Sequence, residues 1–291
     1  MNTTYLTGTN LGGYSFEEII GGSGPTVVYK GTRDSDRQSV VLKAHVIEPS
    51  TQAQETARFL REIQLLRQLD HPHIPRLLDI LDEPPHKIVV FRLIPGVSLG
   101  QVLVEETLID VNRAAWLGLQ IASALSCAHQ LGIIHRDIKP DNILLRTLPN
   151  GVEKAYLTDF GLAKHQHEIE GITAFGEIPG SPSYLAPEQA RGLPGQPESD
   201  QYALGVTFYR ALSGTLPYEK THPLDILAAQ ISEPIPDLAL RAPEIPTPLV
   251  EIIHRCLQKE PEDRFPDTRT LGKALKSLVQ HPHREPVSEE P

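Results

Sequence analysis

The stretch His135-Arg136-Asp137-Ile138-Lys139-Pro140-Asp141-Asn142 places a carboxylate, an ammonium group and an amide close together along the chain. A turn rich in aspartate and lysine is, taken alone, usually a solvated surface loop. Two further short stretches follow it in order, Asp159-Phe160-Gly161 and Ala186-Pro187-Glu188. These three stretches, in this order, carry the strongest functional signal in the sequence.

The first stretch matches the catalytic loop of protein kinases at every diagnostic position. Each residue that this motif specifies would occur by chance at about 1 position in 20, so a chance match to the whole motif in one chain is negligible. With the two later stretches, the chain resembles a eukaryotic-like serine/threonine protein kinase over residues 14–279. Pro187-Glu188-Gln189-Ala190 resembles the bacterial members of that family.

The resemblance implies an α+β fold with two lobes. The N-lobe is expected to be small and β-rich with one main helix, and the C-lobe larger and mostly helical. The expected parts are an N-terminal extension, the N-lobe, the C-lobe and a disordered tail, at residues 1–13, 14–95, 96–279 and 280–291. The tail is rich in proline and lacks an apolar pattern, which favours disorder.

Hydrophobic periodicity fits this division. Up to Pro95 the pattern predicts strands and one helix, at residues 14–31, 39–46 and 87–94 for the strands and 54–69 for the helix. After Gly96 it predicts mainly helices, at residues 113–131, 199–213, 224–231, 249–258 and 268–279. Asn150-Gly151 predicts a hairpin turn between short strands at residues 143–145 and 155–158.

The resemblance assigns a role to each polar residue of the loop. Phosphoryl transfer needs alignment of the acceptor and neutralisation of phosphate charge. Asp137 is the carboxylate that would orient the substrate hydroxyl, and Lys139 is the cation that would reach the γ-phosphate of ATP. A lysine followed by proline here is typical of serine/threonine kinases. Asn142 and Asp159 would hold Mg²⁺, which prefers oxygen ligands.

Lys43 ends a predicted apolar strand, where a lysine by itself is usually a surface residue. Glu62 lies in the next predicted helix, shortly before His71-Pro72. In the family, a lysine and a glutamate at these places pair with each other, and the lysine grips the α- and β-phosphates. The resemblance therefore adds Lys43 and Glu62 to the catalytic residues.

The glycine-rich loop departs from its family. Residues 21–28 read Gly-Gly-Ser-Gly-Pro-Thr-Val-Val, so that Ser23 replaces the second glycine of the motif and Thr26 the third. Glycine lets backbone amides approach phosphate without an intervening Cβ. The replacements leave a pseudokinase, acting as a scaffold or binding module, as an alternative. A small-molecule phosphotransferase of related fold is a second alternative, against which the Ala186-Pro187-Glu188 stretch argues because it serves protein substrates.

The remaining nucleotide contacts follow from the alignment with the family. Adenine would lie between Val28 and Val41 on one side and Leu144 on the other. Phe91 would screen the back of the pocket, and the backbones of Arg92 and Ile94 would bond the base. The full set of nucleotide-binding candidates is Ile20, Gly21, Gly22, Ser23, Gly24, Val28, Val41, Lys43, Phe91, Arg92, Ile94, Leu144 and Asp159.

Regulation is expected on the segment between Asp159 and Glu188. Arg136 could pair with a phosphate there. Candidate acceptors, including for autophosphorylation, are Thr173, Ser181 and Ser183. Thr173 is favoured, because residues 180–184 resemble the family's substrate-docking segment.

Two further sets match structural features of the family. Glu188 and Arg264 match a buried ion pair. A stacked column anchored on Asp200 is matched by Leu66, Leu77, His135 and Phe160.

Composition excludes some classes of partner. The chain has 27 basic and 37 acidic residues and a net charge of −10, which argues against a nucleic-acid-binding face.

Cys127 and Cys256 are too few for a disulfide framework and are interpreted as structural thiols. Residues 114–134 lack charged side chains, yet their several polar residues favour a buried core helix over a membrane span. Residues 1–13 lack the layout of a signal peptide, so a cytoplasmic protein is expected.

Overall fold

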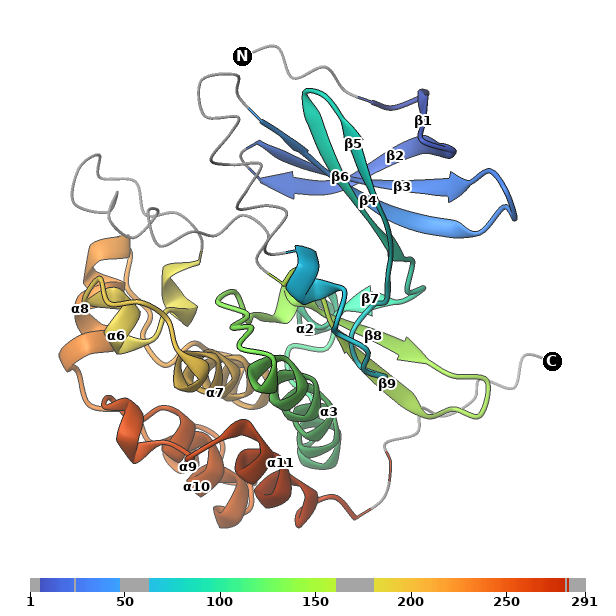
Figure 1. Ribbon diagram of the computed structural model, residues 1–291. Helices are drawn as coiled ribbons and strands as arrows, with labels where there is room; N and C mark the ends of the chain where they lie inside the picture. The colour runs from blue at the N-terminus through green and yellow to red at the C-terminus, as the bar shows by residue number, and fades with distance from the viewer. Residues whose placement is uncertain (1–5, 24, 48–62, 161–180, 281, 283–291) are drawn as a thin grey trace. The chain divides into compact units, whose positions relative to one another are not determined.

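The computed structural model describes residues 6–23, 25–47, 63–160, 181–280 and 282. The chain forms two compact units, Met1–Pro95 and Gly96–Pro291 (Figure 1). Glu62, Gly24 and Thr173 lie outside the described residues, as does nearly all of the tail at residues 280–291.

The first unit is built on one antiparallel sheet with the strand order β1-β2-β3-β4-β6-β5. The strands are β1 (Asn10–Leu11), β2 (Tyr14–Ser23), β3 (Thr26–Arg33), β4 (Ser39–Val46), β5 (Leu77–Glu83) and β6 (His86–Arg92). The strands predicted at residues 14–31, 39–46 and 87–94 are confirmed. Of the helix predicted at residues 54–69, residues 63–69 are described; residues 63–66 are helical, and the helix ends before residue 67.

Residues alternate between the two faces of this sheet. On one face Tyr29, Leu42 and Val90 are fully or almost fully buried and belong to one hydrophobic core. Leu6 lies in the same core, and its N–H donates to the hydroxyl of Tyr29 over 3.1 Å. Leu11 in β1 packs against that core too. Residues 6–11, which the sequence assigns to an extension, therefore complete the first unit.

The second unit is mostly helical. Its helices are α2 (Leu99–Glu105), α3 (Val111–Gln130), α6 (Pro187–Ala190), α7 (Pro197–Ser213), α8 (Pro223–Ser232), α9 (Leu238–Arg241), α10 (Thr247–Cys256) and α11 (Thr268–Lys276). Helices α3 and α7 lie side by side, with α11 packed on α3 and α10 on α7 (Figure 1). Short 3-10 turns are η1 (Pro140–Asn142), η2 (Pro182–Tyr184) and η3 (Pro261–Asp263).

The two central helices have clear start and stop signals. The Asp110 carboxylate accepts the N–H of Arg113 at the start of α3, and Gly132 follows its end with φ 72°. Helix α7 ends at Gly214, whose φ is 75°. Among the described residues, no helix has the length and apolar character needed to cross a membrane, and α3 is buried along much of its length.

A small sheet, β7-β8-β9, completes the second unit. Its strands are β7 (Val97–Ser98), β8 (Ile143–Thr147) and β9 (Glu153–Leu157). The turn predicted at Asn150-Gly151 joins β8 to β9, and Gly151 has φ 77°.

The two cysteines of this unit differ in exposure. Burial of Cys256 raises the pKa of its thiol to about 12, which keeps it protonated, whereas Cys127 is partly exposed.

Candidate functional site

The hairpin of β8 and β9 brings the two predicted metal ligands to one end. Asn142 directly precedes β8, and only Thr158 separates Asp159 from β9. Because these strands are antiparallel and Ile143 is paired with Leu157, the start of one strand lies beside the end of the other. The N–H of Thr158 also donates to the carbonyl of Asn142 over 2.9 Å. Asn142 and Asp159 therefore lie at the same edge of the small sheet.

Asp137, Lys139 and Asn142 form a connected polar cluster. Nδ2 of Asn142 donates to Oδ2 of Asp137 over 3.0 Å and to its backbone carbonyl over 2.7 Å. Nζ of Lys139 lies 3.2 Å from the same Oδ2. Asn142 is buried, whereas the side chains of Asp137 and Lys139 remain 15% and 20% exposed. The carboxylate is therefore held in one orientation while it stays accessible from outside.

The donor set at the hairpin end suits a hard cation. The amide nitrogen of Asn142 is engaged by Asp137, so its oxygen is the atom oriented for a metal. Asp159 is exposed and offers a carboxylate at the same edge. Within the described part of the chain, no group of three or more His, Cys, Asp and Glu side chains could hold a metal. Asn142 and Asp159 therefore fit Mg²⁺ in a site where phosphate oxygens supply further ligands.

His135 links the polar cluster to the strand end. Its Nδ1 accepts the N–H of Asp137 over 3.3 Å, and its Nε2 donates to the carbonyl of Thr158 over 2.7 Å. Burial lowers the pKa of His135 despite the nearby carboxylates, so the ring is neutral with its proton on Nε2. The ring packs edge-on against Phe160 at 4.7 Å between centroids. This contact of the predicted column is confirmed.

Asp200, in the first turn of α7, holds the backbone that precedes Asp137. Its carboxylate accepts the N–H groups of His135 and Arg136 over 2.8 and 2.9 Å, and it is 1% exposed. The predicted anchor is confirmed. Sequence reasoning missed His129, whose Nε2 donates to the same carboxylate over 2.8 Å. The available signal was weak, because His129 is one of several polar side chains on a largely apolar helix.

Two residues of this region have a left-handed backbone. Arg136 has φ 66° and Asp159 has φ 61°. Such a conformation in a non-glycine residue costs about 1–3 kcal/mol and is concentrated at functional sites. The neighbouring hydrogen bonds, from Arg136 to Asp200 and from Thr158 to Asn142, hold it in place. This strain fits a site whose geometry is set before any ligand binds.

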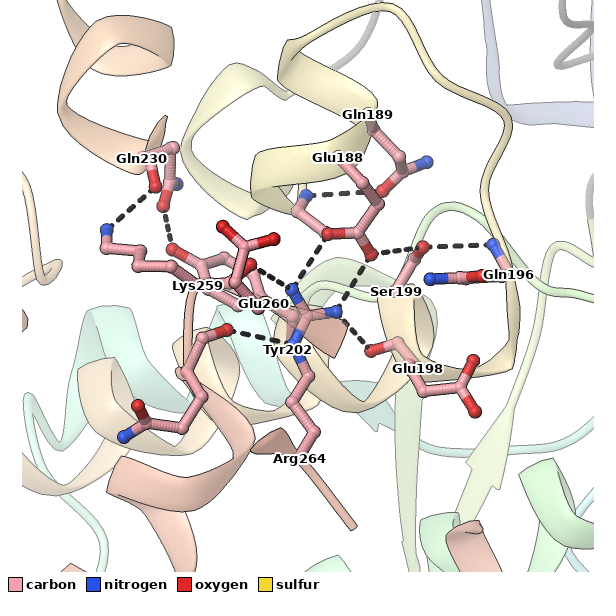
Figure 2. Close-up of polar contacts among 12 residues, drawn as sticks. Glu188, Gln189, Gln196, Glu198, Ser199, Tyr202, Gln230, Lys259, Glu260 and Arg264 are labelled. Atoms are coloured by element: carbon pink, nitrogen blue, oxygen red, sulfur yellow. Dashed lines mark hydrogen bonds and ion pairs between the residues drawn. The ribbon is translucent and has the colours of Figure 1, made fainter. Parts of the chain in front are cut away.

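The third sequence stretch, Ala186-Pro187-Glu188, lies at the start of α6, shortly after the turn η2. Glu188 is buried and accepts two hydrogen bonds of 2.8 Å from the guanidinium of Arg264 (Figure 2). The hydroxyl of Ser199 donates to the same carboxylate over 2.6 Å. The predicted buried ion pair is confirmed. Two of the candidate phosphate acceptors, Ser181 and Ser183, shortly precede this stretch in the sequence and are partly exposed.

In the first unit, four predicted nucleotide-binding residues share one face of the sheet. Val28 is paired with Lys43, and Val41 is paired with Phe91. Paired residues of antiparallel strands, and residues two apart on one strand, lie on the same face. Leu42, between Val41 and Lys43, is fully buried in the core on the opposite face. The four residues thus lie on the face away from that core.

The other candidates have separate places. Ile20, on β2, is exposed, and so is Arg92, the last residue of β6; Ile94 follows β6 and is buried. Leu144 belongs to the second unit and is paired with Ser98 and Tyr156. Lys43 and Asp137 lie in different units, and Glu62 lies outside the described residues.

The glycine-rich region forms the end of the β2–β3 hairpin, where Ser23 is paired with Thr26. Gly22 has φ 150°, and a Cβ there would lie 2.6 Å from the carbonyl oxygen of Thr26, so this position requires glycine. Gly21 has open space where a Cβ would be. Thr26 is buried, and its hydroxyl lies 2.9 Å from Nδ1 of His45 on β4. The residue that replaces the third glycine therefore contributes to the sheet.

Thr26→Gly is accordingly expected to destabilise the protein by about 1–2 kcal/mol, through a lost hydrogen bond and a freer unfolded chain. The measurement is urea-induced unfolding. Ser39→Gly, at an exposed strand position, is the control and should cost less. Equal losses in the two variants would show that the contact with His45 contributes nothing.

A family profile described as protein kinase domain matches residues 14–283. The chain belongs to the protein kinase family. This kinase domain is 36% identical to the serine/threonine-protein kinase PkaA of Streptomyces coelicolor, over 84% of this chain and 44% of that protein. It is 33% identical to the serine/threonine-protein kinase PknE of Mycobacterium bovis, over 94% of this chain and 47% of the relative.

The solved kinase structures agree. The crystal structure of the Mycobacterium tuberculosis PknI kinase domain has a TM-score of 0.70 and 25% identity, and it covers 93% of this chain and 98% of that one. The expected α+β kinase fold is therefore confirmed. The chain spans about half or less of the lengths of PkaA and PknE.

Proposed function

We propose that this kinase domain is an active serine/threonine protein kinase that transfers the γ-phosphate of Mg-ATP to protein hydroxyls. The observation that carries the proposal is the cluster in which Asn142 and Lys139 both contact Oδ2 of Asp137, over 3.0 and 3.2 Å. A pseudokinase, the alternative, has no need for a carboxylate that is held by two neighbouring side chains and still partly accessible. The altered glycine-rich loop is weak support for it, because Thr26 has a place in the sheet.

In this proposal the side chains have separate tasks. Asp137 accepts and orients the hydroxyl of the substrate, with Asn142 fixing its rotamer. Lys139 places a positive charge next to the reacting oxygen. Bound Mg-ATP supplies the phosphoryl group and the charge neutralisation that its transfer requires. Asn142 and Asp159 would hold the metal, and Lys43 would contact the phosphates.

The test is incubation of the protein with radiolabelled ATP, Mg²⁺ and dephosphorylated casein. Label on serine or threonine is expected, and Asp137→Asn should lower its rate by about 10²–10⁴-fold, the usual contribution of a general acid–base group. Nucleotide binding without transfer would favour a pseudokinase. Label on small alcohols but never on casein would favour a small-molecule phosphotransferase.

We further propose regulation by phosphorylation between Asp159 and Glu188, with Thr173 as the main acceptor. Support comes from Arg136, which is exposed beside the catalytic carboxylate and could pair with a phosphate. Ser181 and Ser183 are the other acceptors. Protein substrates, including a second copy of this chain, would be the partners.

A further inference from the structure

Gln230 is a buried amide whose two ends are bonded to different elements. It lies in the last turns of α8 and is 1% exposed. Its Oε1 accepts the hydroxyl of Tyr202 on α7 (Figure 2). Its Nε2 donates to the carbonyl of Ser183 over 2.6 Å. The side chain thus joins α7 and α8 to the turn η2.

The carbonyl of Ser183 obtains its donor from outside its own turn. Within η2 and its flanks, the carbonyl of Ser181 accepts the N–H of Tyr184, and that of Pro182 accepts the N–H of Leu185. The Ser183 carbonyl is instead bonded to Gln230. In a three-residue turn, which has few internal bonds, one outside contact has a large influence on position.

Lys259 fixes the helix end that carries Gln230. Its Nζ donates to the carbonyls of Ala229 and Gln230 over 3.2 and 2.7 Å, and to the hydroxyl of Tyr218 over 2.7 Å. An ammonium group has three N–H donors, and all three have acceptors here. A cation is also favourable at a helix C-terminus, where carbonyls lack partners. Burial lowers the pKa of Lys259 to about 8, so it remains largely charged at neutral pH.

The ring of Tyr202, the other partner of Gln230, contacts a buried ion pair. It is fully buried, and its ring lies 5.1 Å from the guanidinium carbon of Arg264. Arg264 is in turn bonded on two sides to Glu188. Figure 2 shows the bonds between Glu188 and Arg264 and the bond between Tyr202 and Gln230 in one view. The Oε1 end of the Gln230 amide is therefore attached to a firmly held group, from which its Nε2 end can position the Ser183 carbonyl.

We propose that Gln230 is a positioning residue for the protein substrate: its amide clamps the Ser183 carbonyl and so sets the shape of the segment on which the substrate lies. This inference rests on the proposed function, because residues 180–184 were identified as the docking segment by resemblance. It concerns binding of the protein acceptor. ATP binding should not depend on the clamp.

Gln230→Leu tests the clamp, because leucine fills similar space but removes both hydrogen-bonding ends. The KM for dephosphorylated casein is expected to rise about tenfold, which corresponds to ~1.4 kcal/mol. The KM for ATP is expected to change less than about twofold, because ATP binding should not depend on the clamp. A uniform loss of active protein would instead lower kcat and leave both KM values unchanged. This split separates positioning from a simple loss of folded protein.

Two further variants sharpen the result. Ser232→Ala is the control, because it removes a 2.9 Å hydrogen bond to Ala228 from the exposed side of the same helix end. It should leave both KM values unchanged. Gln230→Glu can still accept from Tyr202, but once its carboxyl is ionised it cannot donate to Ser183, so at a pH above the pKa of that buried carboxyl it should resemble Gln230→Leu. Wild-type behaviour of Gln230→Glu at such a pH would overturn the proposal.

Amide hydrogen exchange of residues 183–186 gives a readout that needs no activity. Exchange in Gln230→Leu should be faster than in the wild-type protein, while Ser232→Ala should match the wild type. If the wild type transfers no phosphate, the proposed function fails and exchange alone decides on the clamp. Unchanged exchange, an unchanged casein KM or a parallel rise in both KM values would each refute the role of Gln230.

Discussion

Asp159→Asn is expected to lower phosphoryl transfer by about 10³–10⁵-fold, the effect of removing one charged group that stabilises a transferring phosphoryl group. Asp159 is exposed at the hairpin end beside Asn142, where it supplies the only full negative charge of the two proposed metal ligands. Asparagine keeps the size of the side chain but replaces a charged oxygen by a neutral amide. A hard cation such as Mg²⁺ loses most of its attraction to the site.

The measurement is the initial rate of casein phosphorylation as a function of Mg²⁺ concentration. Asp159→Asn should need far more Mg²⁺ to approach saturation. Asp141→Asn makes the same chemical change at an exposed carboxylate of the neighbouring turn and is the matched control. Both variants should unfold at the wild-type temperature. Wild-type rates for Asp159→Asn at ordinary Mg²⁺ concentrations would remove Asp159 from the metal site.

The polar residues that the sequence identified are those whose geometry is local. Asp137, Lys139 and Asn142 are close together in the sequence, so a short motif is enough to bring their side chains together. Asp159 is only one hairpin away, and Asn150-Gly151 already indicated that hairpin. For such residues the backbone between them is short, and few arrangements are possible. The sequence pattern therefore predicted the loop and the hairpin end well.

Contacts between distant helices were not predictable in the same way. Gln230 contacts Tyr202 and Ser183, and Lys259 contacts the end of α8, across separations of about thirty or more residues. Each residue looks like an ordinary polar position of a helix or turn. Their partners are set by how α7, α8 and the turn η2 pack, which periodicity does not encode. His129 was missed for the same reason.

The strands β1 and β5 were not predicted, because their sequences do not show a clear strand pattern. In β5 only Leu81 is buried, and three acidic residues occur in the same seven, so that neither alternation nor an apolar run is clear. Strand β1 has two residues, too few for any period. Both gain their stability from pairing with neighbours in the sheet. Tertiary context, which a single sequence does not show, decides such segments.

Arg264→Met is expected to lower the free energy of unfolding by about 3–5 kcal/mol, because it leaves a buried charge without its partner. The side chain of Arg264 is 0% exposed. All five of its N–H donors have acceptors: both oxygens of Glu188, and the carbonyls of Glu198, Gln258 and Lys259. Methionine fills much of the volume but satisfies none of these groups.

The double variant Arg264→Met/Glu188→Met distinguishes the loss of the ion pair from the cost of leaving the buried Glu188 charge unpaired. Replacing a buried ion pair by apolar residues is often close to neutral, so the double variant should be more stable than Arg264→Met alone. Arg264→Lys should also be destabilised, because a lysine cannot form two parallel hydrogen bonds to a carboxylate. Urea unfolding of the wild type, Arg264→Met, Glu188→Met and the double variant gives the coupling free energy. A loss below about 1 kcal/mol in Arg264→Met would contradict the importance of the pair.

The same variant should reverse the pH dependence of stability that Glu188 contributes. Burial alone would raise the pKa of Glu188, but Arg264 and Ser199 hold it below its ordinary value. In the wild type this stabilisation is therefore present above the pKa of an unfolded glutamate and is lost as pH falls through the folded pKa. Without Arg264, burial dominates and the folded pKa is raised, so the variant loses stability as pH rises above the unfolded value. Parallel pH profiles for the wild type and Arg264→Met would rule out this electrostatic account, since lost packing alone does not depend on pH.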